Sequence, residues 1–164
     1  MEILFYFLML SFIELNQSFI RKLLIFQATS CSIFIKKIME RKNFNTDKAP
    51  RMSQVFPQAV IADKFIFLSG TPGLNIITNQ VISNDFEEQA RQCFENIKII
   101  LEEAGSSLSK VVKTTIFMVA GNDFSLLNKV YTEYFGENSP ARSAPQVMPF
   151  PGGILISVEC IAML

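Results

Sequence analysis

The chain has 164 residues, of which 49% are hydrophobic and 18% charged, and its formal net charge is zero. This length suits one domain with a short additional segment, and the apolar content allows a sizeable core. The sequence contains no His, which excludes Ser-His-Asp and Cys-His nucleophile systems, HExxH zinc sites and imidazole proton transfer. Acid–base chemistry would therefore depend on carboxylates, Lys, Tyr, Cys or water.

Three cysteines, Cys31, Cys93 and Cys160, are widely spaced, form no CxxC pair and match no zinc pattern. We expect buried thiols and a reducing compartment. Four basic and two acidic residues lie up to Ile38, which leaves 11 basic and 13 acidic residues, a net charge of −2, in the rest of the chain. This balance disfavours a nucleic-acid partner, because such partners usually require clustered positive charge.

Residues 1–38 differ in composition from the rest of the chain. Ile3 to Ile13 is an almost unbroken apolar run that is shorter than a typical transmembrane helix. Three interpretations are open: the segment is absent from the mature protein and Met39 is the working start, it is an organelle transit segment, or it is a membrane anchor. We favour the first, which divides the chain into a non-core segment at 1–38 and a domain at 39–164. A membrane would be a partner only if residues 1–38 are retained.

The first part of the domain predicts short strands. Residues 42–56 are polar and predict an extended lead-in. Two β-type runs, 58–63 and 65–69, flank a short polar turn and predict a hairpin. The glycines and the proline of 70–73 are expected to break the chain, and 81–82 is a candidate third strand.

Two helices are predicted next, with a strand between them. The first begins after Asp85, with Glu88 completing a capping box, and Gly105 is placed to end it. Residues 111–119 are rich in β-branched side chains and predict a central strand. The buried face of the first helix is expected to comprise residues at helical spacing, namely Phe86, Ala90, Cys93, Phe94, Ile97, Ile100 and Leu101.

The second helix is capped by Asn122 or Asp123 and ended by Gly136. After it, the pattern predicts a short strand at 142–147 and, beyond a loop rich in proline and glycine, a last strand at 154–161. The apolar face of this helix is expected to comprise Phe124, Leu127, Tyr131 and Phe135.

This order of elements indicates a mixed α+β fold. Two helices can cover only one face of such a sheet. The last strand is apolar on both sides, so the second face also needs a cover, and oligomer formation is its natural source.

Arg142 is the most informative residue for function. It lies among small residues and prolines in 139–144, which is an unusual setting for a surface charge. After Arg51 the chain has only one other arginine, Arg91, in a polar helix stripe. A guanidinium held at Arg142 can bind a carboxylate through two hydrogen bonds. Together with Glu159, the one acid of the last strand, it indicates a site for a small acid.

A set of short motifs runs in a fixed order along residues 41–162. They include Thr46-Asp47-Lys48-Ala49-Pro50, Gln58-Ala59-Val60, Ile66-Phe67-Leu68-Ser69-Gly70, Val111-Val112-Lys113-Thr114-Thr115, Asn122-Asp123-Phe124, Pro140-Ala141-Arg142-Ser143 and Val158-Glu159. This set resembles the reactive-intermediate deaminase family, also called Rid or YjgF. The resemblance implies a chorismate-mutase-like α+β fold, with two helices on one face of a mixed β-sheet. It also implies a homotrimer with a central barrel and clefts between neighbouring subunits.

The same resemblance implies hydrolysis of reactive 2-imino and 2-enamino acids to 2-oxo acids and ammonia, as in 2-iminobutanoate/2-iminopropanoate deaminases, without metal or cofactor. Arg142 matches the family's arginine that holds the substrate carboxylate. Glu159 matches the acid that positions the attacking water. Ser69 and Gly70 would assist in binding the carboxylate, and Asn128 would support a loop near Arg142. A cytoplasmic location follows, or a mitochondrial one if the N-terminal segment is a transit peptide.

Several residues depart from the family pattern near this site. Phe56 stands where a tyrosine is common, so a substrate-binding ring is kept and its hydroxyl is lost. Pro57 replaces a usual serine, and Pro145 lies where a strand residue is expected. An alternative interpretation is therefore a catalytically impaired paralogue, a trimer that binds small carboxylates or partner proteins in a chaperone-like way.

Structural alternatives also exist for single residues. Glu159 could simply pair with Lys113 or Arg142 across neighbouring strands. Ser69 and Gly70 could serve the turn alone. A third class, an RNA-acting protein, is disfavoured by the charge balance and by the lack of His and of a phosphate-binding glycine loop.

Overall fold

The structure, a computed structural model, describes residues 21–22, 25–26, 40–51 and 53–164. Arg41–Leu164 form one compact unit. The N-terminal segment 1–38 lies almost entirely outside the described residues, so the favoured start at Met39, like the transit and anchor alternatives, stays a prediction. Among the described residues, no helix is long and apolar enough to cross a membrane.

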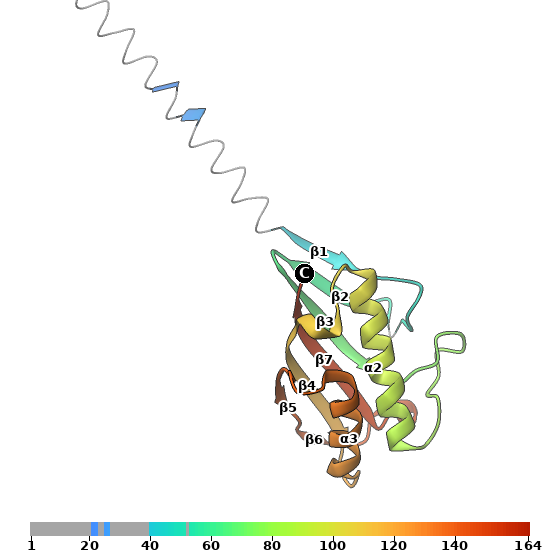
Figure 1. Cartoon of the computed structure of the whole chain (residues 1–164). Helices are drawn as coiled ribbons and strands as arrows, with labels where there is room; N and C mark the ends of the chain where they lie inside the picture. The colour runs from blue at the N-terminus through green and yellow to red at the C-terminus, as the bar shows by residue number, and fades with distance from the viewer. Residues whose placement is uncertain (1–20, 23–24, 27–39, 52) are drawn as a thin grey trace, which may run out of the picture. The chain divides into compact units, whose positions relative to one another are not determined.

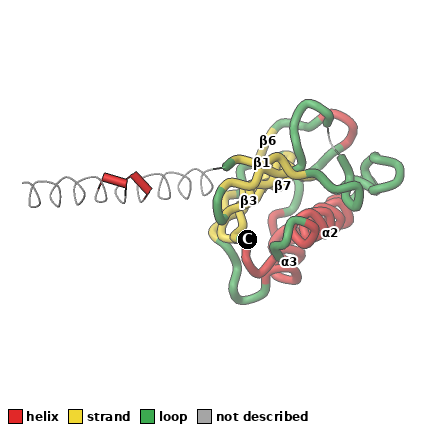
Figure 2. Tube along the Cα trace, turned by 90° about the horizontal axis from the view of Figure 1, so that it is seen from above, coloured by secondary structure: helices red, strands yellow, loops and turns green. Residues whose placement is uncertain are grey.

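In the unit Arg41–Leu164, a seven-stranded sheet is covered on one face by two helices, α2 and α3 (Figures 1 and 2). The strand order is β1-β2-β3-β7-β4-β5, with β6 also paired to β4. β5 and β6 run parallel to β4, and the other pairs are antiparallel. The predicted α+β class is confirmed. The strands are β1 (Arg41–Phe44), β2 (Ala59–Ala62), β3 (Phe65–Pro72), β4 (Val111–Val119), β5 (Ala141–Ser143), β6 (Gln146–Val147) and β7 (Ile156–Met163).

Helix α2 (Phe86–Glu103) begins as predicted, but its capping box is only half formed. The Asp85 carboxylate accepts a 2.9 Å hydrogen bond from the backbone N–H of Glu88. The N–H of Asp85 donates to the Ser83 hydroxyl at 2.9 Å, so this hydroxyl takes the place of the Glu88 carboxylate. All seven predicted apolar positions are buried. Gly105, at φ +84°, follows the last turn and allows the chain to leave the helix.

Two buried amides on α2 were not predicted as part of its packed face. Gln89 donates to the carbonyl of Gly153 and accepts from the N–H of Leu155, each at 2.9 Å. Asn96 donates to the carbonyl of Pro72 at 3.0 Å. A buried amide must be hydrogen-bonded, and these bonds tie α2 to the end of β3 and to the segment that precedes β7.

Helix α3 (Phe124–Phe135) has the predicted cap, Asp123, and ends at Gly136. Its ring side chains pack on Phe94 of α2: the ring centroid of Tyr131 lies 5.8 Å from that of Phe94. Phe124, predicted to be on the buried face, is 38% exposed. The two helices therefore form one layer held by aromatic contacts near the C-terminal end of α3.

Several strand predictions are wrong at their boundaries. Residues 70–73 do not break the sheet, because β3 continues to Pro72 after a bulge and pairs again with β7. The strand predicted at 142–147 is two strands, β5 and β6. Pro145 lies between them and has no N–H to donate, although its carbonyl accepts from the N–H of Met118 at 3.2 Å. The last strand begins at Ile156 rather than at residue 154.

The polar lead-in also contains a strand that was not predicted. Four residues of 41–44 form β1 and pair with β2 at the sheet edge. The candidate third strand at 81–82 is only an isolated bridge between Val81 and Leu74. Backbone hydrogen bonding, which leaves little trace in the side-chain pattern, accounts for β1.

The face of the sheet opposite the helices carries apolar side chains without a cover in the described unit. Phe65 is paired with Met163, and Phe67 with Ile161, on neighbouring strands. Phe65, Phe67 and Met163 are 39%, 41% and 45% exposed. One face of the sheet is therefore left uncovered by the helices, as expected from the sequence.

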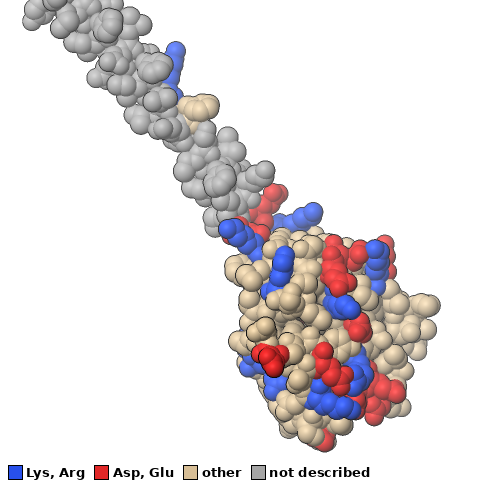
Figure 3. Space-filling model, in the orientation of Figure 1, with Lys and Arg blue, Asp and Glu red and all other residues tan. Residues whose placement is uncertain are grey.

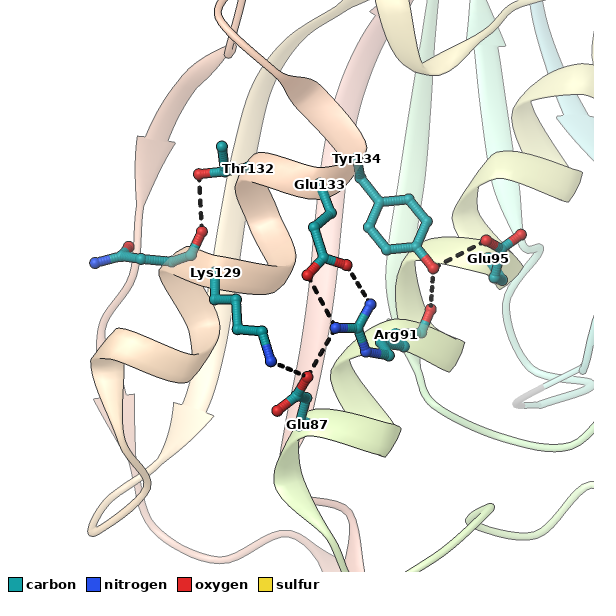
Figure 4. A network of polar contacts seen from close by, with 8 residues as sticks. Glu87, Arg91, Glu95, Lys129, Thr132, Glu133 and Tyr134 are labelled. Atoms are coloured by element: carbon teal, nitrogen blue, oxygen red, sulfur yellow. Dashed lines mark hydrogen bonds and ion pairs between the residues drawn. The ribbon is translucent and has the colours of Figure 1, made fainter.

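A network of ion pairs joins the outer surfaces of α2 and α3 (Figure 4). Arg91, predicted to be solvated, pairs with Glu87 at 2.7 Å and with Glu133 of α3. Lys129 of α3 pairs with Glu87 at 2.9 Å. Hydrogen bonds from Lys129 and Arg91 hold the pKa of Glu87 below its ordinary value. Exposed pairs of this kind stabilise only slightly one by one.

This network predicts a pH-dependent contribution of Glu87 to stability. Its folded-state pKa is depressed, so its contribution is present above the unfolded-state pKa of about 4.5 and is lost as pH falls through the lower folded value. Glu87→Gln should lower the melting temperature near pH 7, and the difference should shrink as pH falls through the lowered pKa of Glu87.

Glu88→Gln is the matched control, because it removes the same charge from the next residue, which forms no ion pair among the described residues. Melting curves of the parent and both variants between pH 7 and 3 make the comparison. Equal pH dependence in Glu87→Gln and Glu88→Gln would show that the network has no specific effect.

Candidate functional site

Arg142 is held on an aromatic platform at the edge of the sheet. It lies on β5, paired with Thr114 of β4. Its guanidinium lies over the ring of Tyr131 on α3, 4.8 Å from the centroid, and 5.8 Å from the centroid of Phe124. Its Nη2 donates to the Asn128 side-chain oxygen at 2.9 Å. One face of α3 therefore fixes the plane and the direction of an exposed cation.

The platform itself is rigid. The Tyr131 side chain is buried, and its hydroxyl lies 2.9 Å from the Thr114 hydroxyl in a hydrogen bond that either group can donate. Its ring also lies 4.6 Å from that of Phe135. Burial raises the pKa of the Tyr131 hydroxyl, so it stays protonated at neutral pH. A stacked guanidinium leaves its in-plane N–H groups available for a carboxylate.

Asn128 is in contact with Arg142, as expected from the sequence. The stacking of Arg142 on Tyr131 was not predicted. The spacing offered an indication, since Phe124, Asn128 and Tyr131 stand four and three residues apart and so share one helix face. The spacing alone cannot identify the cation above that face, because Arg142 comes from another element.

Three other predicted site residues line a small hollow where the loop 50–58 passes β3. They are Phe56, Ser69 and Gly70, and Arg51 lines the hollow with them. A side chain at Gly70 would place its Cβ 2.9 Å from the Ser157 hydroxyl, so a larger residue here would require the Ser157 side chain to move.

Ser69 is engaged in holding the wall of this hollow. Its hydroxyl donates to the Pro57 carbonyl at 2.8 Å, and its N–H donates to the Gln58 carbonyl at 2.9 Å. The Ser69 hydroxyl could therefore donate to a ligand carboxylate only if its hydrogen bond to the Pro57 carbonyl breaks.

Glu159 lies opposite Ser69 and Gly70 in the strand register. The bulge in β3 falls at Ser69 and Gly70. The residues before and after it are paired with the two neighbours of Glu159 on β7. Glu159 is exposed and, among the described residues, forms no ion pair. Lys113 instead donates to the Ser143 hydroxyl at 2.7 Å. The structural alternative, a pair between Glu159 and a neighbouring cation, is therefore not observed.

The two groups of residues do not converge within one chain. Arg142 is in register with Thr114 on the helix-covered face, whereas Glu159 is in register with Thr115 on the opposite face. β7 and β4 also separate β3 from β5. Three strand spacings of about 4.8 Å place Ser69 roughly 14 Å from Arg142, too far for one small acid to contact both.

Neither a metal cluster nor a reactive thiol is present in the described part of the chain. No group of three or more His, Cys, Asp or Glu side chains there could hold a metal ion. Cys93 and Cys160 are buried free thiols, as predicted. Burial raises the pKa of Cys160 to about 12 and that of Cys93 further, which keeps both thiols protonated. Cys31 lies outside the described residues.

Comparisons with known proteins agree with the motifs. The family model described as Endoribonuclease L-PSP matches residues 46–164. A RutC family protein of Pyrococcus abyssi is 43% identical over 124 residues, covering 76% of this chain and 98% of that protein. The 2-iminobutanoate/2-iminopropanoate deaminase of Homo sapiens is 38% identical over 123 residues, covering 75% and 90%. The crystal structure of Escherichia coli TdcF with bound serine is 32% identical, with a TM-score of 0.69, and covers 75% of this chain and 98% of that chain. The resemblance and the fold class predicted from sequence are confirmed.

The platform under Arg142 predicts that the Tyr131 ring, more than its hydroxyl, supports carboxylate binding. Tyr131→Leu removes the ring and should weaken binding of 2-oxobutanoate by about tenfold, since a cation–π contact contributes about 0.5–2 kcal/mol. Tyr131→Phe keeps the ring and should change the affinity for 2-oxobutanoate by no more than about threefold. It should lower stability by about 1 kcal/mol, because Thr114 loses its partner.

Isothermal titration calorimetry measures the affinities. Tyr134→Leu is the matched control, because Tyr134 also packs on Phe94, at 5.3 Å, and makes no contact with Arg142 in the described structure. If Tyr131→Leu and Tyr134→Leu weaken binding equally, the effect belongs to helix packing and not to the platform.

Proposed function

Because the chain belongs to the Endoribonuclease L-PSP family, the reactive-intermediate deaminase (Rid or YjgF) family, we propose that it hydrolyses 2-imino acids and their 2-enamino tautomers to 2-oxo acids and ammonia. Curated relatives from human, rat and cattle are named 2-iminobutanoate/2-iminopropanoate deaminase. The observation that carries the proposal is the Arg142 guanidinium, which is fixed, stacked and free of any carboxylate partner in the described part of the chain.

Arg142 holds the carboxylate next to the imine carbon. Tyr131 restricts its guanidinium to one plane and Asn128 occupies one of its donors. The remaining in-plane donors match the two oxygens of a carboxylate. A substrate gripped at this end presents its C=N group in a defined position, which lowers the entropic part of the barrier.

Glu159 positions the water that attacks. The water oxygen bonds to the imine carbon, the π electrons of C=N move to nitrogen, and nitrogen takes up a proton. A second proton passes from the new hydroxyl to nitrogen, C=O forms, and the C–N bond breaks to release ammonia. An exposed carboxylate without an ion pair among the described residues can accept the proton of the attacking water and return it to nitrogen.

The site is completed between copies of the chain. Arg142 of one copy meets Ser69, Gly70 and Glu159 of a neighbour, because within one chain roughly 14 Å separate Arg142 from Ser69, and Glu159 lies on the opposite sheet face. The exposed apolar side chains Phe65, Phe67 and Met163 support association through the uncovered sheet face. A closed homotrimer with the uncovered sheet face inside a central barrel both completes the site and buries these apolar side chains.

Two observations favour the second candidate, a trimer that binds small carboxylates or partner proteins without hydrolysis. Phe56 has no hydroxyl to contact substrate or water. The Ser69 hydroxyl is already bonded to Pro57. Both candidates share Arg142 as the carboxylate anchor, so only a rate measurement separates them.

An RNA-directed activity finds less support in the charge distribution. On the face drawn in Figure 3, basic and acidic side chains are interspersed. Phosphate backbones select clustered Lys and Arg.

The proposal predicts faster decay of an enamine generated in situ by a threonine dehydratase. Arg142→Ala should lower kcat/KM by on the order of a hundredfold, because a charge-assisted two-bond contact is lost. Arg142→Lys should retain part of the rate, since it keeps the charge and loses the fork. Ultraviolet absorbance of the enamine follows the decay, and ammonia release confirms hydrolysis.

Arg41→Ala is the control for loss of an exposed arginine away from the site, and it should match the parent. If the parent does no better than buffer while it remains a folded trimer, the deaminase proposal fails for this substrate, and the carboxylate-binding candidate takes first place.

A further inference from the structure

The hollow at Phe56, Ser69 and Gly70 contains a cation without a counterion. Arg51 lines it, and no Asp or Glu is among the lining residues. Within the described residues Arg51 forms no ion pair. The rim of the hollow, where Arg51 is exposed, therefore carries a positive charge that the described chain does not pair with a carboxylate.

The backbone is anchored at Arg51 and at the two residues before it. Buried Gln58 donates from its amide nitrogen to the carbonyls of Ala49 at 3.0 Å and Pro50 at 3.1 Å. The Asn79 amide donates to the carbonyl of Arg51 itself at 3.1 Å. The arginine thus extends from a fixed point at the rim of the hollow, which reduces the ordering cost of a contact with a ligand.

Two cations on neighbouring segments have carboxylate partners, whereas Arg51, like Arg41 and Lys42 of β1, has none among the described residues. Lys48, three residues earlier, pairs with Glu103 at 2.8 Å. Arg91 on α2 pairs with Glu87 and Glu133. The carboxylate that pairs with Arg51 would therefore come from outside the described residues. A planar guanidinium is suited to bind a carboxylate through two hydrogen bonds.

We infer that the completed cleft takes 2-imino acids with a second carboxylate, such as 2-iminoglutarate. This inference rests on the proposed function. Arg142 of one copy binds the carboxylate beside the imine carbon, and Arg51 of the neighbouring copy binds the distal carboxylate. The Phe56 ring, which lines the same hollow, lies against the apolar carbons between them. A substrate with one carboxylate would leave Arg51 unpaired.

The test uses stable 2-oxo acids in place of short-lived imines. Isothermal titration calorimetry of the full-length chain compares 2-oxoglutarate with 2-oxobutanoate at constant ionic strength. The parent should bind 2-oxoglutarate at least about tenfold more tightly, as expected for one added charge-assisted contact. Arg51→Gln should abolish this preference and leave the affinity for 2-oxobutanoate within about twofold. Lys48→Gln, the same charge change on a paired lysine outside the hollow, should leave the preference intact.

Three results would overturn the inference and leave the proposed function standing. The parent could bind both acids equally, Arg51→Gln could weaken both equally, or Lys48→Gln could reduce the preference as much as Arg51→Gln. The last two would indicate a general effect of surface charge. If neither acid binds, the carboxylate site of the proposed function fails together with this inference.

Discussion

One β-sheet separates the fixed guanidinium of Arg142 from the exposed carboxylate of Glu159. Arg142 is in register with Thr114 on the helix-covered face of β4, and Glu159 is in register with Thr115 on the other face. Because side chains alternate along a strand, no local adjustment can bring both to one side. The same sheet leaves its second face without helices, so the feature that separates Arg142 from Glu159 also leaves exposed the apolar side chains through which we propose that copies of the chain associate.

Different contacts hold the two halves of the proposed site, namely Arg142 and the Ser69-Gly70 turn. Tyr131 links the buried core to an exposed guanidinium, since its ring packs on Phe94 and its hydroxyl bonds to Thr114. On β3, the Ser69 hydroxyl donates to the Pro57 carbonyl and the Ser69 N–H donates to the Gln58 carbonyl, which fixes the turn next to Gly70. Fixed contacts of this kind are what positioning of a small substrate requires.

The spacing of side chains in the sequence predicted the buried face of α2, but it did not predict strand features that depend on backbone hydrogen bonds. The apolar face of α2 and its Asp85 cap follow from spacing and capping chemistry. Gly70 and Pro72 are typical of a chain break, yet a bulge lets β3 continue through them. Arg142 could be selected from its unusual neighbours. Its contact with Tyr131 could not, because that contact depends on where β5 lies beside α3.

Subunit mixing tests most directly whether the cleft is shared between copies of the chain. Arg142→Ala and Glu159→Gln, each impaired alone, would be unfolded, mixed in equal amounts and refolded. If the two residues act from different copies, about a quarter of the clefts in random trimers regain both, and enamine hydrolysis should reach about that fraction of the parent rate. Activity no higher than that of the two variants refolded separately would contradict the account.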